Sequence, residues 1–381
     1  MLKLACVVLL AVAVAGAPAD LLDGTELVLT FLVHRHGDRT PIDGWASYSN
    51  NPEKLVELSE PYGYGQLTNF GKRRGYQLGQ SIRTRYNGLI APRYNRSEVY
   101  IRSTDSTRAK MTILSALAAI YPPLENIWDD INWTPVPYTT APPLYDFNLA
   151  YANCPAFIEN YKKLMVAPSK SMTNTSRKIN VLSILSKHSG VDLLQSPGLA
   201  YAVYDVYTSQ ISLGIPVDPE IQAIWPEVEK IAGEAVEVAF GDKNFIALQA
   251  GVLLNEFYKA ACDIISGVDS TRVRIYSAHD FNVFSLIFVT KIVNKQGVPK
   301  YGSAYALELR RVMETDKYVV VPVYLPSPGE DFIHLEVEGC GTVCDYQQFV
   351  DITSEYALDE DTWRTKCGWT KDIYIDDSTF A

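Results

Sequence analysis

The chain has 381 residues, of which 47% are hydrophobic and 20% are charged, and this composition excludes a disordered chain and fits one or two globular domains. Its formal net charge of −10 argues against general affinity for nucleic acid or anionic lipid. The sequence contains neither paired Cys-x-x-Cys spacings nor a His-x-x-x-His motif, so it offers no obvious zinc site.

The first predicted element is an N-terminal leader. Residues 1–19 combine Lys3 with a run of apolar residues and several small ones, which is the pattern of a secretory signal peptide. Its removal would take away one positive charge and change the net charge from −10 to about −11. No later segment reaches the roughly 20 apolar residues that cross a bilayer, so we expect a soluble, secreted chain without a membrane anchor.

Three apolar runs, ELVLTFLV, VYI and RVRIYSA, are each followed at once by polar residues. The polar segments are HRHGDRTP (34–41), RSTDSTR (102–108) and HDFN (279–282). Continuous apolar runs are typical of strands that are buried on both faces, as in a parallel sheet covered by helices. Ligands bind at the carboxyl ends of such strands. We therefore expect an α/β fold in which the three polar segments meet at one edge of the sheet.

Helical patterns lie between these strands. Residues 68–86 begin at Thr68, a good N-cap, and residues 107–120 and 246–265 have equally helical spacing. The apolar face predicted for the first helix consists of Phe70, Tyr76, Leu78, Ile82 and Tyr86.

The pattern changes between residues 135 and 240, where Pro-rich turns and short helical candidates occur without a convincing strand. We interpret this segment as a helical cap inserted into an α/β core. The core then consists of residues 20–134 and 241–381.

The polar segments are rich in arginine and histidine, which favours phosphate chemistry. The planar guanidinium groups of Arg35, Arg39 and Arg102 offer paired donors that match phosphate oxygens. The imidazole of His36 can attack phosphorus as a nucleophile, and neighbouring positive charges should keep it neutral. We expect Gly37 to let the backbone approach the ligand.

The segment RHGDRTP resembles the R-H-G-x-R-x-P signature of the histidine acid phosphatases (branch 2 of the histidine phosphatases), and RSTDSTR and SAHD follow in the family's order. The resemblance covers nearly the whole mature chain and is strongest to secreted animal enzymes of the prostatic, lysosomal and insect-venom type. It implies a phosphoglycerate mutase-like α/β core, with a mostly parallel sheet flanked by helices and a smaller helical cap.

The resemblance also implies a role for each motif residue. His36 would accept the phosphoryl group as a phosphohistidine, and Asp280 would protonate the leaving alcohol and then activate water. The phosphate would be held by Arg35, Arg39, Arg102 and His279. The implied enzyme is an acid phosphatase that hydrolyses small phosphomonoesters without a metal or other cofactor, is secreted or lysosomal, and is compatible with a homodimer.

Two alternatives remain at this point. Fungal and bacterial phytases carry the same His-Asp motif, so an inositol phosphate hydrolase is the first alternative. The second is a secreted binding protein that keeps the fold without turnover. The complete set of motif residues argues against the second alternative, because a chain without activity is free to lose any of them.

The cysteines are odd in number once Cys6 leaves with the leader, so at least one stays unpaired. The resemblance implies disulfides between Cys340 and Cys344 and between Cys154 and Cys367. It leaves Cys262 without a partner, and because this residue lies in a helical apolar pattern, we expect a buried thiol.

Some polar residues are expected to be structural or modified. Because successive side chains of a strand point to opposite faces, His34 should point away from Arg35 and be held by hydrogen bonds in the sheet. Arg108 should stabilise the second motif by hydrogen bonds. In a secreted chain, the asparagines of three Asn-x-Ser/Thr sequons are expected to carry glycans. They are Asn95, Asn132 and Asn174.

Overall fold

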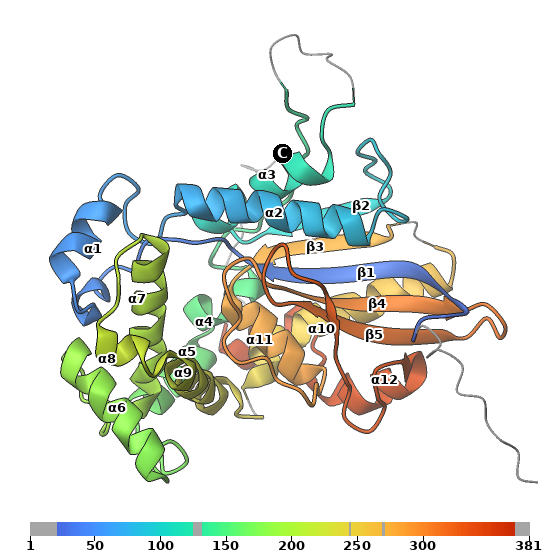
Figure 1. Ribbon diagram of the computed structural model, residues 1–381. Helices are drawn as coiled ribbons and strands as arrows, with labels where there is room; N and C mark the ends of the chain where they lie inside the picture. The colour runs from blue at the N-terminus through green and yellow to red at the C-terminus, as the bar shows by residue number, and fades with distance from the viewer. Residues whose placement is uncertain (1–20, 125–131, 244, 269–270, 370–381) are drawn as a thin grey trace, which may run out of the picture.

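The computed structural model describes residues 21–124, 132–243, 245–268 and 271–369 (Figure 1). The predicted signal peptide, residues 1–19, lies outside the described residues.

The centre of the molecule is a seven-stranded sheet with the order β2-β3-β1-β4-β5-β6, in which β7 also pairs with β5. Strands β1, β3 and β2 are parallel to one another, whereas β4 and β5 extend the sheet in antiparallel fashion. The strands are β1 (Thr25–Arg35), β2 (Val99–Ser103), β3 (Val273–Ala278), β4 (Ala304–Val312), β5 (Tyr318–Leu325), β6 (Ile333–His334) and β7 (Cys344–Asp345). The α/β fold class and the three predicted strands are confirmed.

Helices cover both faces of the sheet. On one face lie α2 (Asn69–Arg85) and α3 (Thr107–Ile120), and on the other α10 (Ile246–Ile265) and α11 (Asp280–Val289) (Figure 1). The side chains of β1 alternate between two cores, with Phe31 facing α10 and Leu32 facing α2 and α3. Burial on both faces explains why this strand is a continuous apolar run.

The other helices lie outside these three layers, which are the sheet and the helices on its two faces, or connect segments of them. The α-helices are α1 (Pro52–Ser59), α4 (Ala150–Asn153), α5 (Pro155–Val166), α6 (Ser176–Ser189), α7 (Ala200–Ser212), α8 (Pro219–Gln222), α9 (Trp225–Phe240), α12 (Tyr346–Thr353) and α13 (Glu360–Cys367). The 3-10 helices are η1 (Ala46–Tyr48), η2 (Phe147–Leu149), η3 (Pro197–Leu199) and η4 (Ser354–Tyr356). Helices α1 and α5 to α9 gather beyond the carboxyl end of β1 (Figure 1).

The buried face of α2 differs from the one predicted for this helix. Thr68 caps the helix as expected, since its side chain accepts a hydrogen bond from the Gly71 amide. However, Phe70 and Tyr76 are exposed. A Cβ atom added at Gly79 would lie 2.1 Å from a backbone oxygen of α3, so small residues, rather than aromatic ones, form the contact between α2 and α3.

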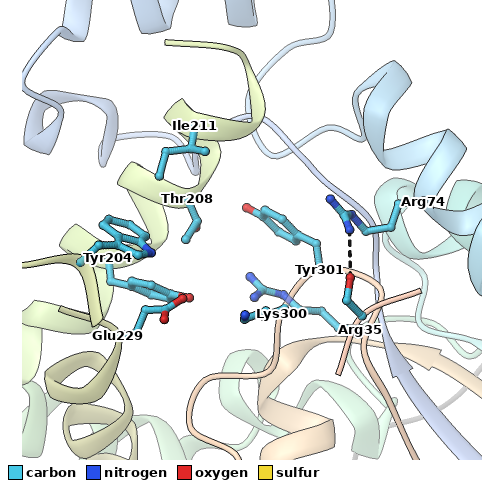
Figure 2. A pocket seen from close by; sticks show the side chains of 10 residues that line it. Arg35, Arg74, Tyr204, Thr208, Ile211, Glu229, Lys300 and Tyr301 are labelled. Atoms are coloured by element: carbon cyan, nitrogen blue, oxygen red, sulfur yellow. Dashed lines mark hydrogen bonds between the residues drawn. The ribbon is translucent and has the colours of Figure 1, made fainter. Parts of the chain in front are cut away.

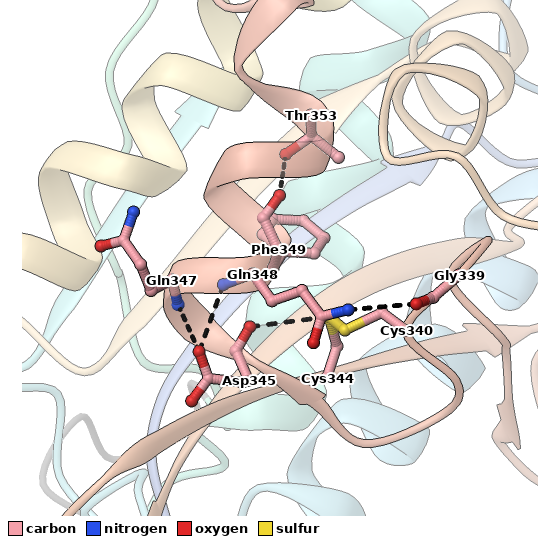
Figure 3. Close-up of a disulfide and its surroundings, with 8 residues drawn as sticks. All are labelled: Gly339, Cys340, Cys344, Asp345, Gln347, Gln348, Phe349 and Thr353. Carbon is pink, nitrogen blue, oxygen red and sulfur yellow. Dashed lines mark hydrogen bonds between the residues drawn. A yellow bond between two sulfur atoms is a disulfide. The ribbon is translucent and has the colours of Figure 1, made fainter.

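Two disulfides join distant and local segments. One links Cys154, just before α5, to Cys367 at the end of α13. The other, between Cys340 and Cys344, closes the loop that leads into β7 and α12 (Figure 3). Both are the pairs implied by the resemblance. The prediction for Cys262 was wrong: its thiol is free and exposed, because it lies on the solvent side of α10.

The three sequon asparagines, Asn95, Asn132 and Asn174, are all exposed. Within the described residues, no helix has the length and apolar character needed to span a membrane.

Candidate active site

The candidate site lies at the carboxyl edge of the sheet, where β1 ends and His36 follows. The His36 amide donates to the carbonyl of Ala278 at the end of β3, at 3.1 Å. Its ring Nδ1 lies 2.8 Å from the carbonyl oxygen of Gly37. A carbonyl can only accept, so Nδ1 carries the proton and Nε2 keeps a free electron pair. This is the tautomer that a nucleophile needs.

The backbone beside His36 is fixed by α2 and α3. A Cβ atom at Gly37 would lie 2.3 Å from the carbonyl oxygen of Gly71, and the Gly37 amide donates to the Thr112 hydroxyl at 3.0 Å. Gly37 is therefore required for close contact between the loop and α2. Its predicted role, approach of the backbone to a ligand, differs from the contact that the structure shows.

Arg35 and Arg39 point toward the same carboxylate. Arg39 Nη2 lies 2.8 Å from both oxygens of Asp205, and Arg35 Nη2 lies 3.4 Å from its Oδ1. Arg35 also donates from Nη1 to the carbonyl of Pro299 at 2.6 Å, and its guanidinium stacks 4.3 Å from the centre of the Tyr301 ring. These contacts hold two guanidinium groups side by side, which is the arrangement that binds a dianion.

His279 stands next to His36, with a distance of 5.4 Å between the ring centres. Its Nδ1 lies 3.3 Å from Nη2 of Arg108, and its Nε2 lies 3.0 Å from the hydroxyl of Thr104. Because Arg108 can only donate, Nδ1 accepts and Nε2 donates to Thr104. The third motif therefore meets the second one through these two bonds.

Asp280 begins α11 and lies in the same cluster. Its Oδ1 accepts the backbone N–H of Phe281 at 2.9 Å. Its Oδ2 lies 2.9 Å from Nη2 of Arg35 and accepts the hydroxyl of Tyr201 at 2.8 Å. The carboxyl group thus faces Arg35, the last residue of β1.

The placement of Arg102 differs from the prediction. Its Nη2 pairs with Asp146 at 2.8 Å, and its guanidinium lies 4.3 Å from the centre of the Phe147 ring. The arginine of the second motif that contacts His279 is instead Arg108, at 3.3 Å. The structure therefore does not bring Arg102 into the cluster around His36.

The sheet register gives the physical reason. Arg102 is level with Tyr276 and hence with Val33, which is two residues before Arg35. That offset is roughly 7 Å along the strands, and β2 lies two strands from β1, roughly 10 Å away. Arg108, in the first turn of α3, reaches the edge instead.

The site is buried and positively charged, and this sets the protonation of its histidines. Burial, followed by the positive charge of Arg108, lowers the pKa of His36 well below its usual value. The same two causes lower the pKa of His279. Both imidazoles are therefore neutral in mild acid.

Three further groups of the site were not found from the sequence. Asp205 and Tyr201 come from α7, and Tyr301 lies in the turn just before β4. Asp205 is the one charged residue in the apolar helix AYAVYDVYTSQIS, and a lone acid in such a helix indicates a buried partner. Tyrosines are too common in this chain to be singled out.

A pocket of about 240 Å³ adjoins the cluster and shares Arg35 with it (Figure 2). Tyr301 also lines this pocket, and the centre of its ring lies 5.8 Å from the centre of the His36 ring. The remaining lining residues are Arg74, Tyr204, Thr208, Ile211, Trp225, Glu229, Lys300 and Ser327.

Among the described residues, one group of side chains has the spacing of metal ligands. It consists of His188, Asp218 and Glu220, and Glu220 is already paired with Lys187. None of these residues belongs to the cluster around His36.

His34 is fully buried in β1, and its Nδ1 donates to the carbonyl of Arg35 at 3.1 Å. Burial lowers its pKa to about 4. The unfolded chain protonates this histidine below about pH 6.5 while the folded chain does not, so stability falls as the pH falls from 6.5 to 4. We expect His34→Phe to remove up to about 3 kcal/mol of this acid-induced loss.

Urea unfolding at pH 7 and pH 4.5 measures the effect as the difference between the two pH values within each variant. His334→Ala, which changes an exposed histidine, should keep the wild-type difference. The same loss in His34→Phe as in the wild type would contradict the prediction.

Comparison with known proteins identifies the same family that the three sequence motifs indicated. The family model for the histidine phosphatase superfamily (branch 2) matches residues 26–181. Human prostatic acid phosphatase is 32% identical over 90% of this chain and 88% of the relative. The lysosomal acid phosphatase of Xenopus laevis is 28% identical over 99% of this chain and 86% of the relative.

Solved structures share the fold at lower identity. A phytase from Hafnia alvei in complex with tartrate superposes with a TM-score of 0.66 at 14% identity, covering 89% of this chain and 99% of that structure. A phytase from Citrobacter braakii gives a TM-score of 0.63 at 13% identity, with 88% and 99% covered.

Proposed function

The chain belongs to branch 2 of the histidine phosphatase superfamily, and from this premise we propose that it is an acid phosphatase whose phosphoryl acceptor is His36. The observation that carries the proposal is the His36 ring itself. Its Nδ1 is tied to the Gly37 carbonyl, and it lies buried beside Arg35 and Arg39. Nε2 is thus left as a neutral nucleophile next to donors that suit a phosphate dianion.

In the first step, Nε2 of His36 attacks phosphorus and the bond to the ester oxygen breaks. Arg35, Arg39 and Arg108 neutralise the charge on the phosphoryl oxygens, and the Asp280 carboxyl gives its proton to the leaving alcohol. In the second step, water attacks the phosphohistidine, Asp280 takes up a proton from that water, and the bond between nitrogen and phosphorus breaks. Inorganic phosphate and the starting enzyme result.

Asp205 has a positioning role in this proposal. It comes from α7, whereas Arg35 is the last residue of β1 and Arg39 lies in the loop that follows. By holding both guanidinium groups before phosphate arrives, it reduces the entropy lost on binding. We propose that the segment carrying α7, residues 135–240, acts as the cap of the site.

We also propose that the protein is secreted and glycosylated, with a lysosomal location as the alternative. The leader-like residues 1–19, the two disulfides, and the exposed asparagines of the three sequons support this proposal.

A panel of phosphomonoesters assayed in mild acid tests the function. We expect hydrolysis of alkyl and aryl phosphates that is unchanged by EDTA and is inhibited by vanadate, because arginines rather than a metal would bind the phosphoryl group. Inositol hexakisphosphate belongs in the panel, and faster release of phosphate from it than from simple esters would favour a phytase. Activity that is lost with EDTA and restored by a divalent ion would contradict the mechanism.

Lysine substitutions distinguish the two arginines of the second motif. We expect Arg108→Lys to lower kcat/KM by about 10²-fold, because an ammonium group cannot reproduce a two-pronged contact with a phosphoryl group. Arg102→Lys is the matched control, since its guanidinium pairs with Asp146, and its kcat/KM should stay within about 3-fold of the wild type. Steady-state kinetics on p-nitrophenyl phosphate measure both. A larger loss of kcat/KM in Arg102→Lys than in Arg108→Lys would show that Arg102, and not Arg108, binds the phosphate.

A further inference from the structure

The hydroxyl group of Tyr201 is the contact between α7 and the carboxyl group of Asp280. It donates to Oδ2 of Asp280 at 2.8 Å, and the Tyr201 side chain is buried, with 4% exposed. Its ring is wedged between Trp45 and Phe281, with ring centres 6.5 Å and 5.3 Å away. The hydroxyl therefore has little freedom to turn elsewhere.

The carboxylate of Asp280 accepts hydrogen bonds from three groups in the structure. These groups differ in whether the reaction would change their contact with the carboxylate. The Phe281 amide binds Oδ1 and is fixed in the backbone of α11. Arg35 binds Oδ2 but is also a phosphate ligand in the proposed function. In the proposed reaction, the phosphoryl oxygens of a bound ester would compete with Asp280 for the charge of Arg35, and a protonated Asp280 would attract that charge less. Tyr201 then remains as the side-chain partner of Oδ2.

We propose that Tyr201 is a positioning residue of the phosphatase reaction, whose hydroxyl holds the Asp280 carboxyl in the orientation from which it protonates the leaving alcohol. This inference rests on the proposed function. It adds a residue of the helical segment to the acid step, although no motif of the sequence contains Tyr201.

A tyrosine hydroxyl suits this task because it both donates and accepts hydrogen bonds. It can therefore bind Oδ2 in either protonation state of the carboxyl group. Burial raises the pKa of Tyr201 well above its usual value, so the hydroxyl itself keeps its proton. Tyr201 thus orients the acid without competing with it as a proton donor.

The substitution Tyr201→Phe tests the proposal with two substrates. For ethyl phosphate, whose alkoxide needs a proton to leave, we expect kcat/KM to fall about 10-fold. For p-nitrophenyl phosphate, whose leaving group is already stable, the loss should be less than about 3-fold. The inhibition constant of vanadate should stay within about 2-fold, because the arginines are untouched.

A double-mutant cycle shows whether Tyr201 acts through Asp280. In the background Asp280→Asn, the added change Tyr201→Phe should lower kcat/KM for ethyl phosphate by less than about 2-fold. Tyr161→Phe is the matched control, since Tyr161 also packs against Phe281, at 6.0 Å, but has no hydrogen bond to Asp280. This control should behave as the wild type on both substrates.

Each result bears on the proposal. Equal losses on the two substrates, or a changed vanadate constant, would assign Tyr201 a purely structural role and overturn it. An unchanged rate for ethyl phosphate would overturn it as well. If the wild-type chain hydrolyses no phosphomonoester, the proposed function itself fails, and this outcome is distinct from a loss of substrate discrimination in the variant.

Discussion

Replacing His36 with alanine should abolish turnover on every phosphomonoester, lowering kcat by about 10⁴-fold or more. The reason is that the reaction runs through a bond between phosphorus and Nε2, and the neighbouring His279 uses both of its ring nitrogens in bonds to Thr104 and Arg108. Asp280 cannot replace the nucleophile, because it is needed as the acid. Steady-state assays on alkyl and aryl phosphates measure the loss.

Trapping of the intermediate supplies the decisive control. Wild-type enzyme mixed with labelled substrate and quenched in alkali, where a phosphohistidine survives, should carry label on His36. His36→Ala should carry none, and its circular dichroism should show that it is folded. His334→Ala, which removes an exposed imidazole, should be labelled and active as the wild type. Label on any other residue would disprove the proposed acceptor.

Asp280→Asn should give the second-largest loss, and the loss should depend on the leaving group. Asparagine keeps the shape of the side chain but has no acidic proton, so alkyl phosphates should lose about 10² to 10⁴-fold in kcat. The phosphorylation step with p-nitrophenyl phosphate should lose much less, because nitrophenolate leaves without protonation. Rapid-quench measurements of phosphoenzyme formation separate this step from hydrolysis of the intermediate.

The same variant makes a prediction for the second step. Because Asp280 would also activate water, phosphoenzyme formed from p-nitrophenyl phosphate should accumulate in Asp280→Asn. If alkyl and aryl substrates lost activity equally while phosphoenzyme formed at the wild-type rate, Asp280 would not be the acid of the first step.

The fold could be predicted where local pattern and tertiary burial agree. Helices α3 and α10 have the bounds that their apolar spacing predicts, and β1 to β3 follow continuous apolar runs. The antiparallel strands β4 and β5 were not predicted, because they lack polar motifs at their ends that would mark them. The buried face of α2 was misjudged because glycine contributes nothing to a count of apolar side chains, although it permits the closest helix contact.

In the candidate site, too, some residues could be placed from the sequence and others could not. His36 and His279 could be placed because each directly follows a strand, and Asp280 because it is the next residue after His279; the edge of a parallel sheet brings such positions together. The choice between Arg102 and Arg108 could not be made, because it depends on the register between β2 and β3 and on where α3 begins. Asp205 and Tyr201 lie about 170 residues from the first motif, and α7 must dock before their proximity exists.

The central strand β1 is made early in synthesis, but its neighbours in the sheet are made late. β1 pairs with β3, which starts at Val273, and with β4, which ends at Val312. A nascent chain that has not yet emerged from the ribosome beyond these residues holds the RHGDRTP segment without a sheet edge or an Asp280 beside it. Catalytic competence therefore arrives after most of the chain has been translated, and the apolar β1 must be shielded until then. The disulfide between Cys154 and Cys367 forms later still, because Cys367 is translated near the end of the chain. Until then, the thiol of Cys262 can form a non-native disulfide with Cys154.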